Sequence, residues 1–168
     1  MRRRPTLRVH GERSKTVNKT SVWACEESRV EHGGFAFLRK RLGAAAGSQT
    51  IGISWFELQP SKKAFPFHYH LANEEALFVL EGEGVLRLGD EEHNVRAGDY
   101  VAFIPGPPGH QVINRSTAPL RYLAISTMIE PEVAVYPDSK KLGVLARAQN
   151  LASVHKQDAA VDYYEGED

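Results

Sequence analysis

Three histidines and one glutamate carry the clearest chemical signal in this chain. His68 and His70 are separated by one residue, Glu75 follows shortly after them, and His110 lies forty residues beyond His70. Imidazole nitrogens and carboxylate oxygens are ligands that divalent transition metals accept. The four residues therefore predict a site for one divalent metal.

The spacing of the first two histidines matters because of strand geometry. Side chains at alternate positions of an extended segment point to the same face. If residues 65–70 form a strand, His68 and His70 point inward together.

Glu75 stands at the beginning of an apolar run, Ala76 to Leu80, that is closed by glycines and predicts a buried strand. On that strand Glu75 would share a face with Leu77 and Val79. Burying a carboxylate there is costly unless a cation or hydrogen bonds compensate its charge. A bound metal would be such a cation.

Two stretches resemble the two motifs of the cupin superfamily. The first is His68-x-His70-x4-Glu75-x6-Gly82, and the second runs from Gly98 through Pro105 to His110-x3-Asn114. The resemblance covers residues 65–82 and 98–114. It implies an all-β, single-domain cupin, that is a double-stranded β-helix or jelly-roll barrel with an N-terminal strand arm, and it implies His68, His70, Glu75 and His110 as the metal ligands.

The spacing of the motifs also separates neighbouring candidates. Six residues lie between Glu75 and Gly82, as the first motif requires, whereas Glu74 would leave seven. Asn114 is expected to fix a loop through its amide group and not to bind the metal.

The second motif has an unusual loop before its histidine. Gly106-Pro107-Pro108-Gly109 combines two residues with fixed φ and two with free φ. We expect a stiff turn that aims His110 into the barrel.

The remaining pattern, short strands with regular turns, favours a β-sandwich or barrel independently of the resemblance. We expect residues 35–38 to form an edge strand, residues 43–48 a loop, and residues 142–154 a short strand or a final helix. The main strands are expected at Thr50–Gln59, Phe65–His70, Ala76–Leu80, Val85–Leu88, Glu92–Val95, Tyr100–Ile104, His110–Asn114 and Leu120–Ser126.

The chain has 168 residues and 42% hydrophobic content, which suits one core. Residues 1–41 contain eleven Lys or Arg against four Asp or Glu, about +7, and the remainder carries about −7. We expect a basic arm (1–21), a barrel (22–155) and an acidic tail (156–168). The arm lacks the aromatic or helical pattern of nucleic-acid binders, so it is expected to pair with the acidic body or with a second subunit in a homodimer.

Several other residues are expected to have no role in the site. His10, His32, His93 and His155 lie outside both motifs, and Cys25 has no histidine partner that would activate it. A lone cysteine and the lack of an apolar membrane-length run favour a cytoplasmic protein without a membrane segment.

Aromatic and basic residues could complete a pocket. Trp55, Phe67, Phe78 and Phe103 are available to line a barrel mouth, and Lys62-Lys63 or Lys140-Lys141 could hold a phosphate, although solvated surface is the simpler interpretation of the lysines.

The ligand set accepts Fe, Mn, Ni, Cu or Zn and does not select among them. Two functions follow from it. One is a metal-dependent enzyme acting on a small polar metabolite, either an isomerase or lyase on a sugar or sugar phosphate, or an Fe(II) dioxygenase. The other is a non-catalytic cupin that binds a sugar or carboxylate. No catalytic base can be assigned from the sequence, since Glu75 would be occupied by the metal.

Overall fold

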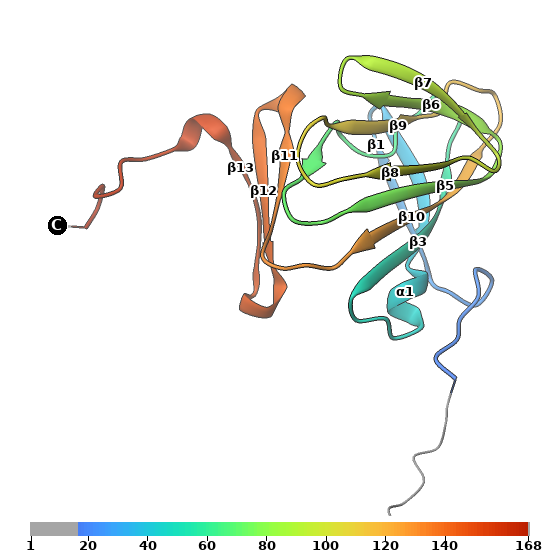
Figure 1. Cartoon of the computed structure of the whole chain (residues 1–168), viewed down its shortest axis with the longest axis horizontal. Helices are drawn as coiled ribbons and strands as arrows, with labels where there is room; N and C mark the ends of the chain where they lie inside the picture. The colour runs from blue at the N-terminus through green and yellow to red at the C-terminus, as the bar shows by residue number, and fades with distance from the viewer. Residues whose placement is uncertain (1–16, 168) are drawn as a thin grey trace, which may run out of the picture.

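A computed structural model describes residues 17–167, which form an almost entirely antiparallel β-structure (Figure 1). The N-terminal arm expected at residues 1–21 lies mostly outside the described residues. One short helix, α1 (Leu42–Ala45), and three 3-10 turns, η1 (Pro137–Ser139), η2 (Arg147–Gln149) and η3 (Gln157–Ala159), interrupt the strands. The strands are β1 (Glu27–His32), β2 (Phe35–Lys40), β3 (Ile51–Leu58), β4 (Tyr69–His70), β5 (Glu75–Glu81), β6 (Glu83–Leu88), β7 (Glu91–Arg96), β8 (Tyr100–Phe103), β9 (His110–Ile113), β10 (Leu120–Thr127), β11 (Glu132–Tyr136), β12 (Lys141–Ala146) and β13 (Leu151–Lys156).

The strands form two walls around one core. The first wall is a six-stranded sheet in the order β1-β2-β3-β10-β5-β8, and the second contains β7-β6-β9 and β13-β12-β11-β4. The two parts of the second wall meet at a pair of backbone hydrogen bonds. The His68 N–H donates to the His110 carbonyl (3.2 Å), and the His110 N–H donates to the His68 carbonyl (2.7 Å). This arrangement is the jelly-roll barrel expected from the sequence. Figure 1 shows β11, β12 and β13 standing beside one end of the other strands.

The inside of the barrel changes from apolar to polar along its strands. Facing pairs on β3 and β10 run in the order Leu58–Leu120, Phe56–Tyr122, Ser54–Ala124 and Gly52–Ser126. On β5, Glu75 pairs with Ser126 at the polar end. The apolar end is closed by side chains with almost no exposed surface, so a polar ligand can be accommodated only at the other end.

Asn114 has the loop-fixing role expected of it. Its fully buried amide donates to the carbonyls of Leu58 (3.1 Å) and Ala118 (2.8 Å), and its oxygen accepts from the Ser116 backbone N–H (2.9 Å). These bonds join the end of β9 to the end of β3, far from the histidines along the barrel.

Two strand predictions need correction. Residues 65–70 are not a continuous strand, because Pro66 lacks an N–H and only Tyr69–His70 pair as β4. Residues 35–38 are not an edge strand either, since β2 lies between β1 and β3.

Three segments contain helix or strand that the sequence analysis did not predict. Residues 43–48 begin inside α1, and Gly43 packs so closely that a Cβ there would lie 2.9 Å from the Ile53 backbone nitrogen. Beyond Pro131, a strand that was not predicted, β11, pairs with β4 and β12. Residues 142–154 form neither a helix nor a single strand but most of the β12–β13 hairpin.

Among residues 17–167, no helix is both long and apolar enough to cross a membrane.

Candidate metal centre

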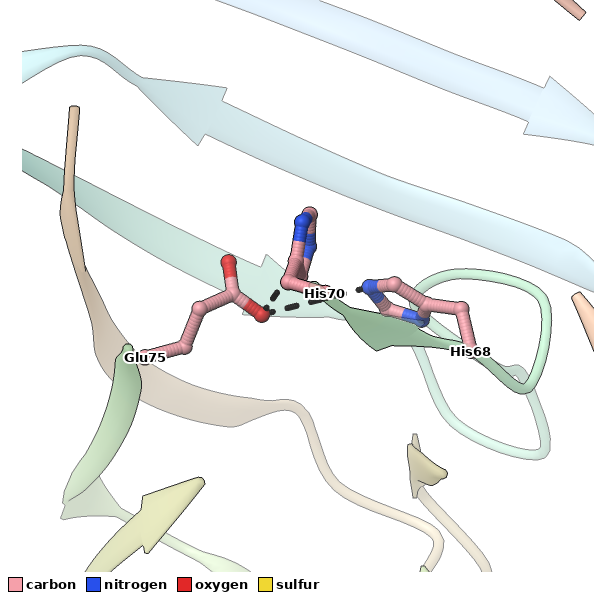
Figure 2. A group of neighbouring side chains, drawn as sticks. All are labelled: His68, His70 and Glu75. Carbon is pink, nitrogen blue, oxygen red and sulfur yellow. Dashed lines mark ion pairs between the residues drawn. The ribbon is translucent and has the colours of Figure 1, made fainter. Parts of the chain in front are cut away.

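Three imidazole Nε2 atoms surround one carboxylate oxygen. Glu75 Oε2 lies 3.2 Å from His110, 3.3 Å from His70 and 4.0 Å from His68. Figure 2 shows the Glu75 carboxylate pointing toward the rings of His68 and His70. Potential ligand atoms of His68, His70 and Glu75 lie within 4.8 Å of one another. His110 is not in this group of three but contacts the same Glu75 oxygen. The structure thus brings all four predicted residues together.

The backbone before β4 fixes the orientation of the His68 ring. Its Nδ1 lies 2.8 Å from the Pro66 carbonyl oxygen, which can only accept a hydrogen bond. The proton of the neutral ring is therefore on Nδ1, and the Nε2 lone pair faces Glu75.

A buried carboxylate on β11 stands behind the His70 ring. His70 Nδ1 is buried without a hydrogen bond, and it lies 3.5 Å from Oε2 of Glu132. Glu132 accepts backbone N–H groups from Leu71 (3.0 Å) and Asn73 (2.8 Å), among others. An acceptor at this position favours a proton on Nδ1 and leaves Nε2 of His70 available to a cation.

An aromatic ring and a tight loop hold His110. Its imidazole stacks on Phe103 with ring centroids 4.0 Å apart, and Phe103 is the cross-strand partner of Glu75. The preceding loop is tied down where Gly106 donates to the His70 carbonyl (2.7 Å) and where Gly109 accepts from Gly89 (2.9 Å). The second motif therefore connects directly to the first.

The electrostatics of the cluster favour a cation. Burial, reinforced by the nearby His110, lowers the pKa of His68 to about 4, so this ring stays neutral at pH 7. Burial alone would raise the pKa of Glu75, but its hydrogen bond with His110 and the charges of the surrounding imidazoles lower it, so the carboxylate is ionised. The Nε2 lone pair of the neutral His68 ring then faces the ionised Glu75 carboxylate, which is unfavourable until a positive charge lies between them. This donor set fits a divalent metal.

Several residues that were expected to lie outside the site are described by the structure, and none of these joins the cluster. Glu74 is exposed and its backbone, not its carboxylate, contacts β10 through Thr127. His32, His93 and His155 are exposed and distant from the cluster along the sheets, and His10 lies outside the described residues.

A cavity of about 360 Å³ opens in front of the cluster, within the size range typical of small-molecule sites. Its wall includes residues that the sequence did not indicate, namely Arg39, Tyr122, Glu132, Tyr136 and Arg147. Tyr136 stacks on His68, with centroids 5.8 Å apart. The available signal was the alternation in Glu132-Val133-Ala134-Val135-Tyr136, which is typical of a strand with Glu132 and Tyr136 on one face.

Several expected pocket residues lie elsewhere. Phe103 lines the cavity, whereas Trp55, Phe67 and Phe78 do not. Phe67 packs instead under the Arg87 guanidinium, 3.8 Å from its ring centroid. The two lysine pairs also stay outside the cavity wall, and the basic residues that line it are both arginines.

Comparison with known proteins agrees with the fold. The family model described as "Cupin domain" matches residues 54–126. An uncharacterised protein of Methanocaldococcus jannaschii is 36% identical over 59 residues, which span 35% of this chain and 46% of that protein. The match thus covers less than half of the length of this curated relative.

Two solved structures match over nearly their full length. A cupin-superfamily sugar phosphate isomerase of Silicibacter pomeroyi is 28% identical with a TM-score of 0.76, covering 88% of this chain and 98% of that one. A protein of Acidithiobacillus ferrooxidans, provisionally described as a sugar phosphate isomerase, is 23% identical with a TM-score of 0.77, covering 87% and 96%. With both motifs in place on a jelly-roll barrel, residues 54–126 of the chain form a cupin domain.

Proposed function

We propose that this protein is a metal-dependent enzyme that isomerises a small polar metabolite of the sugar-phosphate class, with the metal held by His68, His70, Glu75 and His110. The observation that carries the proposal is the convergence of three imidazole nitrogens on one ionised carboxylate oxygen at the wall of the cavity. The name of the Silicibacter pomeroyi relative supports the choice of an isomerase over other cupin reactions.

The bound metal would act as a Lewis acid that polarises a carbonyl or hydroxyl oxygen of the substrate. Around it, Phe56, Phe103 and Val112 exclude water from one side of the cavity. Ser54, Ser126 and Thr127 supply hydroxyl groups from β3 and β10 on the polar side. This division suits a ligand with several hydroxyl groups.

Tyr136 is the group that would hold a proton near the substrate. Burial raises the pKa of its phenol, so it keeps its proton at neutral pH and donates a hydrogen bond. Its ring packs on His68, so its position depends on the ligand cluster.

Both carboxylates of the cavity wall are already engaged. Glu75 faces the three imidazoles, and Glu132 accepts several hydrogen bonds and has a lowered pKa despite its burial. Neither is well suited to act as a general base. This observation favours a second candidate function, binding of the same class of ligand without turnover.

The test begins with metal analysis of untagged protein purified without chelators. The metal-loaded protein is then incubated with a panel of aldose and ketose phosphates, and interconversion is followed by NMR spectroscopy, with His70→Ala as the control. Turnover that requires the metal and is lost in the control supports the isomerase. Binding of panel members without turnover supports the second candidate, and wild-type protein that takes up no metal contradicts both.

A further inference from the structure

Arg39 places a positive charge inside the barrel wall. It pairs with Phe56 across β2 and β3, and it shares the inward face of β2 with Phe37. The guanidinium lies 5.4 Å from the Phe56 ring centroid, and its Nε donates to Ser54 Oγ at 3.1 Å. These contacts hold the group against the wall of the cavity that also contains Glu75 and the histidines.

The partly buried charge of Arg39 has no carboxylate partner within residues 17–167. Its hydrogen bond to Ser54 uses one of the five N–H donors of a guanidinium. Four other arginines do form ion pairs: Arg87 with Asp138, Arg115 with Glu92, Arg121 with Glu57 and Glu81, and Arg147 with Glu130. An unpaired charge is costly to remove from water. A bound ligand is therefore expected to supply the counterion of Arg39.

A second cation faces the same cavity. Arg147, in the η2 turn between β12 and β13, also lines the wall, although Glu130 occupies part of its guanidinium. Burial lowers the pKa of Arg39, and the charges of Arg41 and, more weakly, Arg147 act in the same direction, whereas Glu75 opposes them. Bringing two like charges to one cavity is unfavourable unless an anion lies between or beside them.

We propose that the cavity contains an anion subsite, in which Arg39, assisted by Arg147, binds the terminal phosphate or carboxylate group of the ligand. The planar guanidinium fork matches the oxygens of either group. The ligand would then place its hydroxyl or carbonyl end toward the histidine cluster. This inference rests on the proposed function, because it assigns the charged end of the same ligand.

The subsite can be tested with anions that lack the rest of a substrate. Metal-loaded wild-type protein is titrated calorimetrically with inorganic phosphate and, separately, with malonate. The same titrations are run on Arg39→Gln, on Arg39→Lys, and on Arg115→Gln, a control that removes a surface ion pair away from the cavity. Metal content is measured on every sample.

Binding of phosphate or malonate should weaken at least about tenfold in Arg39→Gln, less in Arg39→Lys, and remain unchanged in Arg115→Gln, with full metal content throughout. Tighter binding of phosphate indicates that the charged group of the ligand is a phosphate, and tighter binding of malonate indicates a carboxylate. If Arg39→Gln does not fold, Arg147→Gln, an exposed position, should still weaken binding about threefold. The subsite is overturned if the Arg39 variants bind the anions as tightly as wild type does, or if metal-loaded wild type binds neither anion. Loss of metal from wild type would instead contradict the proposed function.

Discussion

Nδ1 of His70 lies 3.5 Å from Oε2 of Glu132, a carboxylate with only 2% of its surface exposed. Glu132 is the first residue of β11, outside both cupin motifs, and backbone N–H groups of residues 71–73 hold it in place. The side-chain amide of Asn73 also donates to Glu132, and it donates a second hydrogen bond to the Ile129 carbonyl. A strand outside the motifs thus orients one of the histidines.

We predict that Glu132→Gln weakens metal affinity by about ten- to a hundredfold. The amide cannot accept as many hydrogen bonds and it no longer favours a proton on Nδ1 of His70. Competition with a chromophoric chelator measures the affinity, and ¹⁵N shifts of the imidazole report which nitrogen carries the proton. Glu92→Gln, at a surface ion pair, serves as the control. Unchanged affinity and an unchanged imidazole spectrum would show that Glu132 acts only in folding.

Replacing His70 by Ala should reduce metal affinity at least about tenfold while leaving the barrel folded. The side chain is a ligand at the edge of a cavity and contributes little to the apolar end of the core. Metal content by mass spectrometry and far-UV circular dichroism provide the two measurements. His93→Ala, on the exposed strand β7, should retain the metal. Full metal occupancy in His70→Ala would refute the assigned ligand set.

The stability of the metal-free protein should fall as the pH drops from about 6.5 to about 4.5. Burial lowers the pKa of His68 to about 4 in the folded chain, below its value in an unfolded chain. In this window the unfolded state therefore binds a proton that the folded state does not. The pKa of Glu75 is itself lowered, so protonation of this carboxylate contributes mainly at lower pH.

The loss is expected to be on the order of 2–3 kcal/mol across that window, from about 1.4 kcal/mol for each pH unit. Urea denaturation at the two pH values measures it. His68→Gln should flatten the dependence, and His93→Gln should not. A wild-type slope equal to that of His68→Gln would contradict the assigned cause.

The parts of the site that depend on a few consecutive residues could be predicted from the sequence. Strand parity and motif spacing placed His68 and His70 together and selected Glu75 over Glu74, because each depends on a few consecutive residues. The buried strands of the barrel followed from their apolar runs for the same reason. The exception was residues 65–70, where the inward orientation survived although Pro66 prevented a regular strand.

The residues that complete the site could not be found in this way. Arg39 and Glu132 reach the site through pairings between strands that are distant in the sequence or joined by a long connection, β2 with β3 and β11 with β4. The two lysine pairs are adjacent charges in the sequence, but Lys62 and Lys63 lie between β3 and β4 and Lys140 lies just before β12, all outside the cavity wall. A single arginine on the inward face of β2 gave no comparable local signal.

We predict that the chain forms a homodimer through the edge strand β1. All six of its residues are exposed, including Val30, and within residues 17–167 no strand pairs with the outer edge of β1. Light scattering at micromolar concentration should give twice the chain mass. Val30→Lys should weaken the dimer, whereas Val154→Lys on the opposite edge strand β13 should not. A wild-type monomer, with or without residues 1–20, would refute the prediction.

Gly109 should be required for metal affinity because it brings the two motifs together. A Cβ at this position would lie 2.8 Å from Cζ of Phe67 and 3.2 Å from the His68 carbonyl oxygen. The same carbonyl accepts the His110 N–H at 2.7 Å, so Gly109→Ala must displace one ligand-bearing segment from the other.

Misplacing a ligand in this way is expected to weaken metal affinity by about tenfold, or about 1.4 kcal/mol. Gly34→Ala is the matched control, since its Cβ would meet nothing within 4 Å. Both variants are titrated with Zn²⁺ in competition with a chromophoric chelator, and their thermal unfolding is recorded. If Gly109→Ala binds Zn²⁺ as tightly as Gly34→Ala, close contact between the two histidine segments does not set the geometry of the site, and the 106–109 loop would instead shape the access route to the cavity.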